Sequence, residues 1–142
     1  MTEIFFYSGA ADKLLVACRL CAKALSQDTR IMVYASDQQI LEKLDKLLWT
    51  FQPTSFLPHC FMHDETALVS STPIVLSDSV APETDYAILL NLHEQCPPDF
   101  ARFKRVIEIA GQLPEDKASA RKRYRHYQQA GFMLHHHQLQ KH

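Results

Sequence analysis

Short apolar runs alternate along the chain with amphipathic stretches of helical period. The short runs predict strands and the amphipathic stretches predict helices. In chain order the predicted elements are a strand at 3–7, a helix at 11–26, a strand at 30–35, a helix at 36–49, strands at 86–92 and 105–110 around a short helix at 98–103, and a last helix at 115–130. Strands separated by such helices pair in parallel, with right-handed crossovers. We therefore predict an α/β fold: a single-domain, Rossmann-like layered fold with a mainly parallel sheet flanked by helices.

Local signals predict where two of the helices begin or end. Ser36 and Gln39 form an S-x-x-Q capping box, which predicts that the second helix begins at Ser36. Gly131 follows the last helix at the position where a left-handed residue commonly ends a helix.

The two least regular parts of the chain are its middle and its end. The proline-containing segment 51–80 predicts only short extended pieces, at 55–57 and 74–76. We expect one domain over residues 1–134, followed by a polar, His-rich C-terminal tail over 135–142 that is frayed.

Composition narrows the class of protein. Hydrophobic residues make up 46% and charged residues 22%, which is typical of a soluble globular domain and excludes a disordered chain. The sequence contains no apolar run of the roughly 18 to 20 residues that a membrane helix requires, and it begins without a basic and then apolar leader. We expect a cytoplasmic protein.

Cys18 and Cys21 form a C-x-x-C pair that could indicate a metal or redox site. Both cysteines fall on the apolar stripe of the predicted helix at 11–26, where they would point inward as small apolar residues. Cys60, with His59 and His63, could nominally complete a zinc site. Core packing is the preferred interpretation, so no metal and no cofactor are expected.

Signatures of catalysis are weak in this sequence. Phosphate-binding loops require several glycines, and the chain has 3, of which only Gly9 follows a predicted strand and precedes a helix. His93 and Cys96 are close enough in sequence to suggest nucleophilic chemistry, but no orienting partner is evident, and a solvent-facing loop is preferred. We expect a protein that is not an enzyme and has no phosphate-binding loop.

Basic residues concentrate near the end of the chain. Residues 101–127 contain eight Lys or Arg and three Asp or Glu, a local charge of +5 in a chain of net charge -1. Arg121, Tyr124, Arg125 and Gln128 share one face of the predicted last helix, so that two guanidinium groups would flank one ring. Such a face, with Leu113 as an apolar neighbour, suits an acidic peptide that ends in an apolar residue.

A second candidate surface consists of Trp49, Phe51 and Phe56, at the end of the second helix and in the proline-bounded loop beyond it. Tryptophan is frequent among interface anchors, but a single Trp is more often part of a core. Judged from the residues alone, a core position for Trp49 is favoured.

The sequence resembles the chi subunit family of the bacterial DNA polymerase III holoenzyme over essentially its whole length, with the segment 60–72 as the exception. The resemblance is carried by residues 30–35, Leu48 and Trp49, 55–59, 87–92, 100–108 and, most densely, 120–132. Arg125 stands where a lysine is familiar in the family, and Gln128 where a basic residue is.

The resemblance implies a non-enzymatic bridge with a nucleotide-binding-like fold. Chi subunits bind the acidic, Pro-Phe-ending C-terminal tail of single-stranded DNA-binding protein (SSB), and through another surface they bind the psi subunit, which connects to the clamp loader. Some members also pair with a helicase-like repair protein. Carried over by position, the expected tail-binding residues are Leu113, Arg121, Tyr124 and Arg125, and the expected psi-binding residues are Trp49 and Phe56.

Two other functions stay open at this point. One is a small nucleotide-dependent enzyme on the same Rossmann-like fold, because a fold alone does not determine function. The other is direct binding of single-stranded DNA by the basic helix, although such binding normally requires a longer basic track with more aromatic stacking platforms.

Overall fold

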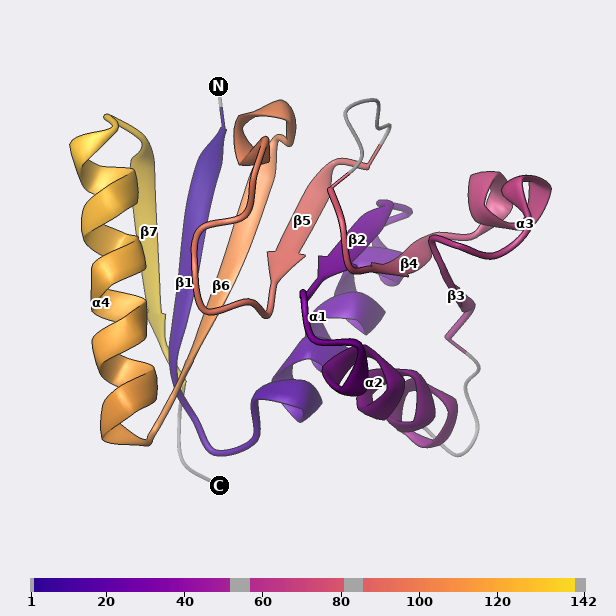
Figure 1. Cartoon of the computed structure of the whole chain (residues 1–142), viewed down its shortest axis with the longest axis horizontal. Coiled ribbons are helices and arrows are strands. Elements are labelled where there is room, and N and C mark those ends of the chain that lie inside the picture. The colour runs from indigo at the N-terminus through magenta and orange to yellow at the C-terminus, as the bar shows by residue number, and fades with distance from the viewer. Residues whose placement is uncertain (1, 52–56, 81–85, 140–142) are drawn as a thin grey trace.

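The computed structural model describes residues 2–51, 57–80 and 86–139. Strands and helices alternate along this chain (Figure 1). The elements are β1 (Glu3–Ala10), α1 (Lys13–Ser26), β2 (Ile31–Tyr34), α2 (Gln38–Thr50), β3 (His59–Phe61), α3 (Thr66–Ser71), β4 (Ile74–Ser77), β5 (Ile88–Asn91), the 3-10 helix η1 (Phe100–Arg102), β6 (Arg105–Gly111), α4 (Pro114–Gln129) and β7 (Met133–Gln138).

The strands form one seven-stranded sheet in the order β3-β4-β2-β5-β6-β1-β7. Every pairing between neighbouring strands is parallel. The predicted α/β fold with a parallel sheet and flanking helices is therefore confirmed. The strands at the two edges of the sheet are β3 and β7.

The sheet separates two apolar cores, because alternate residues of each strand point to opposite faces. The buried side chains of α1 and α2 pack on one face, against residues such as Val33 and Ile109. On the other face, Ala120 and Tyr127 of α4 pack with strand residues such as Phe6 and Val106. Figure 1 shows α4 standing apart from α1 and α2, beside β1 and β7.

Cys18 and Cys21 are fully buried among the apolar residues of α1, which confirms the interpretation that they pack in the core. Burial raises the pKa of the Cys18 thiol to about 12 and also raises the pKa of Cys21. Cys96 differs from the solvent-facing position expected for it. It is half-buried, and its Sγ lies 3.9 Å from the backbone oxygen of Arg123.

The N-cap of helix α2 lies one residue later than the capping box predicted, and the helix itself begins at Gln38. Asp37 is its N-cap, and the Asp37 carboxylate accepts a hydrogen bond of 2.9 Å from the backbone N–H of Gln39. The Ser36 hydroxyl is hydrogen-bonded instead to Nδ1 of His93, at 2.8 Å. A carboxylate is a strong cap in its own right, and it carries charge that the helix dipole favours at this end.

Gly131 ends α4 as predicted and turns the chain back toward the sheet. Its φ is +87°, and the N–H groups of Gly131 and Phe132 donate to the carbonyls of Gln128 and Tyr127, which is the Schellman arrangement. Strand β7 follows directly.

The expectation of a frayed tail from His135 is wrong as far as Gln138, because these residues belong to β7. Strand β7 pairs in parallel with β1, with Phe5 opposite His135 and Tyr7 opposite His137. The His135 ring stacks on Phe5 at a centroid distance of 4.5 Å, and the His137 ring stacks on Tyr7 at 5.1 Å. In β7, imidazole rings therefore make the side-chain contacts to β1 that apolar residues make in most strands.

The segment 57–80, which the sequence left largely unassigned, contains β3, α3 and β4. The extended piece predicted at 74–76 is confirmed as β4, whereas most of the piece at 55–57 lies outside the described residues. Among the helices that the structure describes, none is both long enough and apolar enough to cross a membrane.

Candidate functional site

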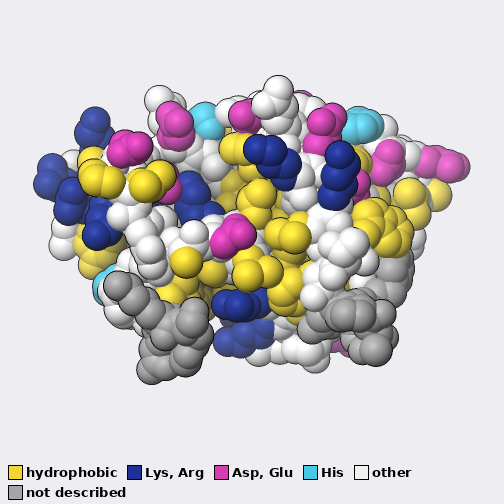
Figure 2. All heavy atoms as spheres, turned by 90° about the horizontal axis from the view of Figure 1, so that it is seen from below, with side chains coloured by type: hydrophobic (Ala, Val, Ile, Leu, Met, Phe, Trp, Pro, Cys, Tyr) yellow, Lys and Arg dark blue, Asp and Glu magenta, His cyan; other side chains and the backbone are white. Residues whose placement is uncertain are grey.

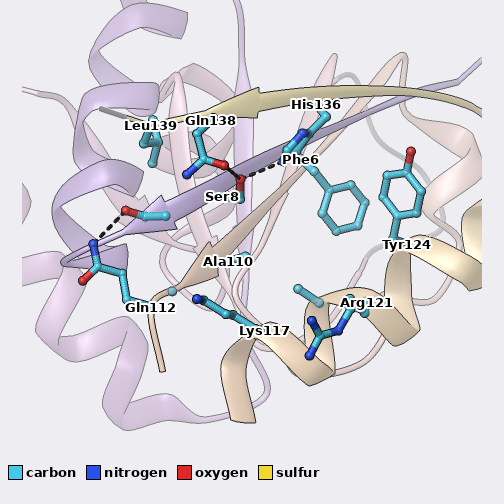
Figure 3. A pocket seen from close by; sticks show the side chains of 13 residues that line it. Phe6, Ser8, Ala110, Gln112, Lys117, Arg121, Tyr124, His136, Gln138 and Leu139 are labelled. Atoms are coloured by element: carbon cyan, nitrogen blue, oxygen red, sulfur yellow. Dashed lines mark hydrogen bonds between the residues drawn. The ribbon is translucent and has the colours of Figure 1, made fainter. Parts of the chain in front are cut away.

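A pocket with a volume of about 680 Å³ lies between α4 and the strands β1, β6 and β7 (Figure 3). It opens near the carboxyl ends of β1 and β6, the edge where open parallel sheets commonly bind their ligands. Its lining residues are Phe6, Ser8, Gly9, Ala110, Gly111, Gln112, Lys117, Ala120, Arg121, Tyr124, His136, Gln138 and Leu139.

Two cations, Lys117 and Arg121, lie on the α4 side of the pocket. They are four residues apart in one helix, so their side chains project from the same face. None of the described residues that line the pocket is acidic. Figure 2 shows Lys and Arg side chains gathered at the end of the molecule where Figure 1 places α4. The pocket is therefore suited to a negatively charged ligand.

An aromatic pair forms the apolar part of the pocket. The rings of Phe6 and Tyr124 meet edge to face, with a centroid distance of 5.2 Å and an interplanar angle of 62°. Ala110 and Ala120 lie in the same lining, and their small side chains leave room beside the rings. This part could receive an apolar or aromatic group whose polar end reaches Lys117 and Arg121.

The pocket wall opposite α4 is polar, and most of its polar side chains are hydroxyl or amide groups. The Ser8 hydroxyl lies 2.7 Å from Nε2 of His136 and donates to the Gln138 side-chain oxygen at 3.0 Å. Gln112 donates from its side-chain amide to the carbonyl of Gly9, at 3.2 Å. Gly9 has a φ of +81°, a conformation that favours glycine, and a Cβ there would also come within 2.7 Å of the Gln138 side-chain nitrogen.

A buried polar cluster fixes α4 on the sheet and so sets the position of the cations. Glu108 of β6 is completely buried, and its carboxylate accepts hydrogen bonds from Arg123 Nε at 2.8 Å, from the Tyr127 hydroxyl at 2.6 Å and from Asn91 Nδ2 at 2.9 Å. Arg123 also donates to the backbone oxygen of Glu94 at 2.9 Å. Helix α4 is thus joined to β5, β6 and the loop after β5.

Burial and charge act against each other in this cluster. Burial raises the pKa of Glu108, while the Arg123 guanidinium and the donors around the carboxylate oppose that rise. Burial and the neighbouring Glu108 carboxylate raise the pKa of Tyr127, which therefore stays a hydrogen-bond donor. Arg123 is 7% exposed, so one of the basic residues counted in the charge of the last helix belongs to the core instead of the surface.

The pocket lining includes two of the four residues expected to bind a tail. Arg121 and Tyr124 are part of it, whereas Leu113 and Arg125 are not. Leu113 is the N-cap of α4 and is 61% exposed, and Arg125 is exposed one turn beyond Arg121. The apolar place beside Tyr124 that was expected for Leu113 is taken by Phe6.

Sequence reasoning missed Phe6, Lys117, His136 and Gln138 as lining residues. Lys117 precedes Arg121 by one helical turn, so helical spacing alone could have found it. Phe6 was indistinguishable from other strand residues of the core. His136 and Gln138 were missed because residues 135–142 were expected to form a frayed C-terminal tail.

Trp49 lies on the surface at the end of α2, 54% exposed, so the residue-based preference for a core position is wrong. Its ring meets His59 edge to face at a centroid distance of 4.9 Å. The His59 ring is held by Asp45 at 2.8 Å and by the backbone oxygen of Leu57 at 2.7 Å. Phe56, the other residue expected on this surface, lies outside the described residues.

The comparisons with known proteins agree with one another. The family model described as DNA polymerase III chi subunit, HolC, matches residues 1–135. The DNA polymerase III subunit chi of Pseudomonas aeruginosa is 29% identical over 143 residues, covering 98% of this chain and 98% of that protein. The protein of the same name from Haemophilus influenzae is 24% identical over 120 residues, covering 84% of this chain and 82% of its own length. The chain belongs to the DNA polymerase III chi subunit family, whose members are accessory subunits of DNA replication.

Proposed function

We propose that the pocket between α4 and β7 binds the acidic C-terminal tail of single-stranded DNA-binding protein. The observation that carries this proposal is the placement of two cations, Lys117 and Arg121, beside an aromatic pair in a pocket whose described lining has no acidic residue. A peptide that ends in phenylalanine presents a ring, a terminal carboxylate and nearby acidic side chains. These are the groups that such a pocket complements.

The chemistry divides between the two parts of the pocket. The terminal ring packs beside Phe6 and Tyr124, where offset or edge-to-face contacts stabilise aromatic pairs. The Arg121 guanidinium pairs with the terminal carboxylate, for which its planar donors are suited. Lys117 and the exposed Arg125 attract the remaining acidic side chains. Affinity for one tail is on the order of micromolar and falls as salt is added.

The test is a calorimetric titration of the protein with an acidic peptide that ends in Pro-Phe. We expect Arg121→Ala to weaken binding about 10-fold, because a charge-assisted hydrogen bond is lost. Lys122→Ala is the matched control: Lys122 is exposed on α4, does not line the pocket and carries the same charge. Equal losses for the two variants would mean that only net charge matters. Failure of the wild type to bind would refute the proposal.

We further propose that the exposed ring of Trp49, with Phe56, binds the psi subunit and so links the protein to the clamp loader. A large exposed aromatic at the edge of a sheet is typical of an interface anchor. We expect Trp49→Ala to abolish co-purification with psi while tail binding is retained. Met133→Ala serves as the control, since Met133 is exposed on the opposite edge strand. A helicase-like repair protein is a further candidate for this surface, and the same variants test it.

A further inference from the structure

Strand β7 places its side chains on the two faces of the sheet in strict alternation, which separates three adjacent histidines. His135 and His137 stack on Phe5 and Tyr7, on the face that α1 and α2 cover in part. His136 points the other way and lines the pocket together with Gln138, as Figure 3 shows. One imidazole of the three therefore belongs to the proposed tail site.

The hydrogen bond between His136 and Ser8 is compatible with a protonated ring as well as with the neutral tautomer that carries its proton on Nε2. Ser8 has a single hydroxyl hydrogen, which it donates to the side-chain oxygen of Gln138 at 3.0 Å. The lone pairs of Ser8 then accept the N–H of His136 Nε2, at 2.7 Å. An imidazolium donates from both ring nitrogens, so this bond persists when the second nitrogen takes up a proton. Protonation requires no rearrangement of the pocket wall.

The charged side chains that share the pocket lining with His136 are the cations Lys117 and Arg121. From α4, Lys117, Arg121 and the phenol of Tyr124 face the pocket, and the segment after β6 contributes the amide of Gln112. Strand β1 contributes Phe6 and Ser8, and none of the described lining residues is a carboxylate. Two cations across an empty pocket oppose a third charge, whereas carboxylates of a ligand between them attract it.

We propose that His136 is a binding residue of this pocket and that an acidic peptide binds there together with a proton. The inference rests on the proposed function. The direction of the pH dependence follows from linkage. A site that binds more protons when it is occupied gains affinity as the pH falls. Histidine side chains change charge between about pH 5 and 8, while peptide carboxylates stay ionised in that range. Tail affinity therefore rises on going from pH 8 to pH 6.

The experiment is calorimetry with an N-acetylated acidic peptide ending in Pro-Phe, at about pH 8 and about pH 6. Each titration is run in two buffers of different ionisation enthalpy, which measures the protons taken up. We expect binding to tighten about 3-fold at the lower pH, the gain from one partly exposed ion pair, with net proton uptake on binding. His136→Gln keeps a polar side chain in the wall and should abolish both the tightening and the uptake.

Matched controls separate His136 from the other histidines. His135→Gln, on the opposite face of the same strand, and His126→Gln, on α4 outside the pocket lining, should retain the pH effect. Thermal melts of the variants establish that each is folded. Wild-type binding with the same affinity at both pH values and no proton uptake would overturn this inference and leave the proposed function intact. Equal pH dependence in wild type and His136→Gln would overturn it as well. Absence of binding at both pH values would refute the proposed function itself.

Discussion

Replacing Glu108 by Gln removes the buried charge that holds α4 against the sheet. The Glu108 carboxylate is completely buried and faces three donors, namely Arg123 Nε, the Tyr127 hydroxyl and Asn91 Nδ2. Gln has nearly the same shape, but it is neutral and presents N–H groups where one carboxylate oxygen accepted hydrogen bonds. At least one donor then faces another donor, and the Arg123 guanidinium becomes a buried cation without its counter-ion.

The expected loss in the free energy of unfolding is about 3 to 5 kcal/mol, the cost of removing one partner from a buried ion pair. A single domain is stabilised by about 5 to 15 kcal/mol in total, so the variant should unfold at a much lower urea concentration. Asp116→Asn provides the comparison: it breaks the partly exposed ion pair with Lys13, of 3.1 Å, and should cost at most about 1 kcal/mol.

The stability of both variants is measured by urea denaturation, with circular dichroism as the probe of unfolding. The midpoints are compared only if the dependence of the unfolding free energy on urea concentration is unchanged. The double variant Glu108→Leu/Arg123→Met should recover part of the stability, because it removes the unpaired charge but leaves the buried Tyr127 hydroxyl without its acceptor. A loss for Glu108→Gln no greater than that for Asp116→Asn would refute the reasoning. So would a double variant less stable than Glu108→Gln alone.

Three further changes test local features of the fold. Asp37→Ala removes the cap of α2 and should cost about 1 kcal/mol in urea denaturation, whereas a larger loss for Ser36→Ala would restore the capping box predicted from sequence. Gly131→Ala meets no atom within 4 Å but forces a positive φ of 87°, so it should cost about 1 kcal/mol through the backbone alone, and an unchanged midpoint would contradict this. The pKa of Cys18 is raised from 9.0 to about 12 by burial, so its contribution to stability is present below pH 9 and lost between pH 9 and 12, as the thiol ionises in the unfolded chain. Alkaline denaturation should be less steep in the Cys18→Ala/Cys21→Ala variant, and equal steepness would exclude the thiols as its cause.

The central part of the fold was predictable because it depends on burial. Strands such as β2 and β5 are apolar on both faces, and α1 and α2 carry clear apolar stripes. These patterns predict buried strands and helices that pack on a sheet. Strand β7 was missed for the corresponding reason. It is an edge strand whose contacts to β1 are made by histidine rings, and its polar sequence carries no apolar alternation.

The candidate site was only half predictable, since helical spacing says which residues share a face but not which neighbour covers that face. Arg121 and Tyr124 were identified from spacing, and both line the pocket. Arg123 lies between them in sequence, and only the partner Glu108, on a distant strand, shows that its charge is buried. The partner of Tyr124 was equally hidden, because Phe6 lies more than a hundred residues away in the chain.

The order of the strands has a consequence for how two partners could share this small protein. Strand β3, beside the helix that carries Trp49, and strand β7, beside the pocket, are the first and last of seven strands. Six spacings of about 4.8 Å separate them, or about 29 Å across the sheet. A tail and a subunit bound at these two edges would then contact separate surfaces, and the hydrogen-bonded sheet between them would keep the distance between those surfaces constant.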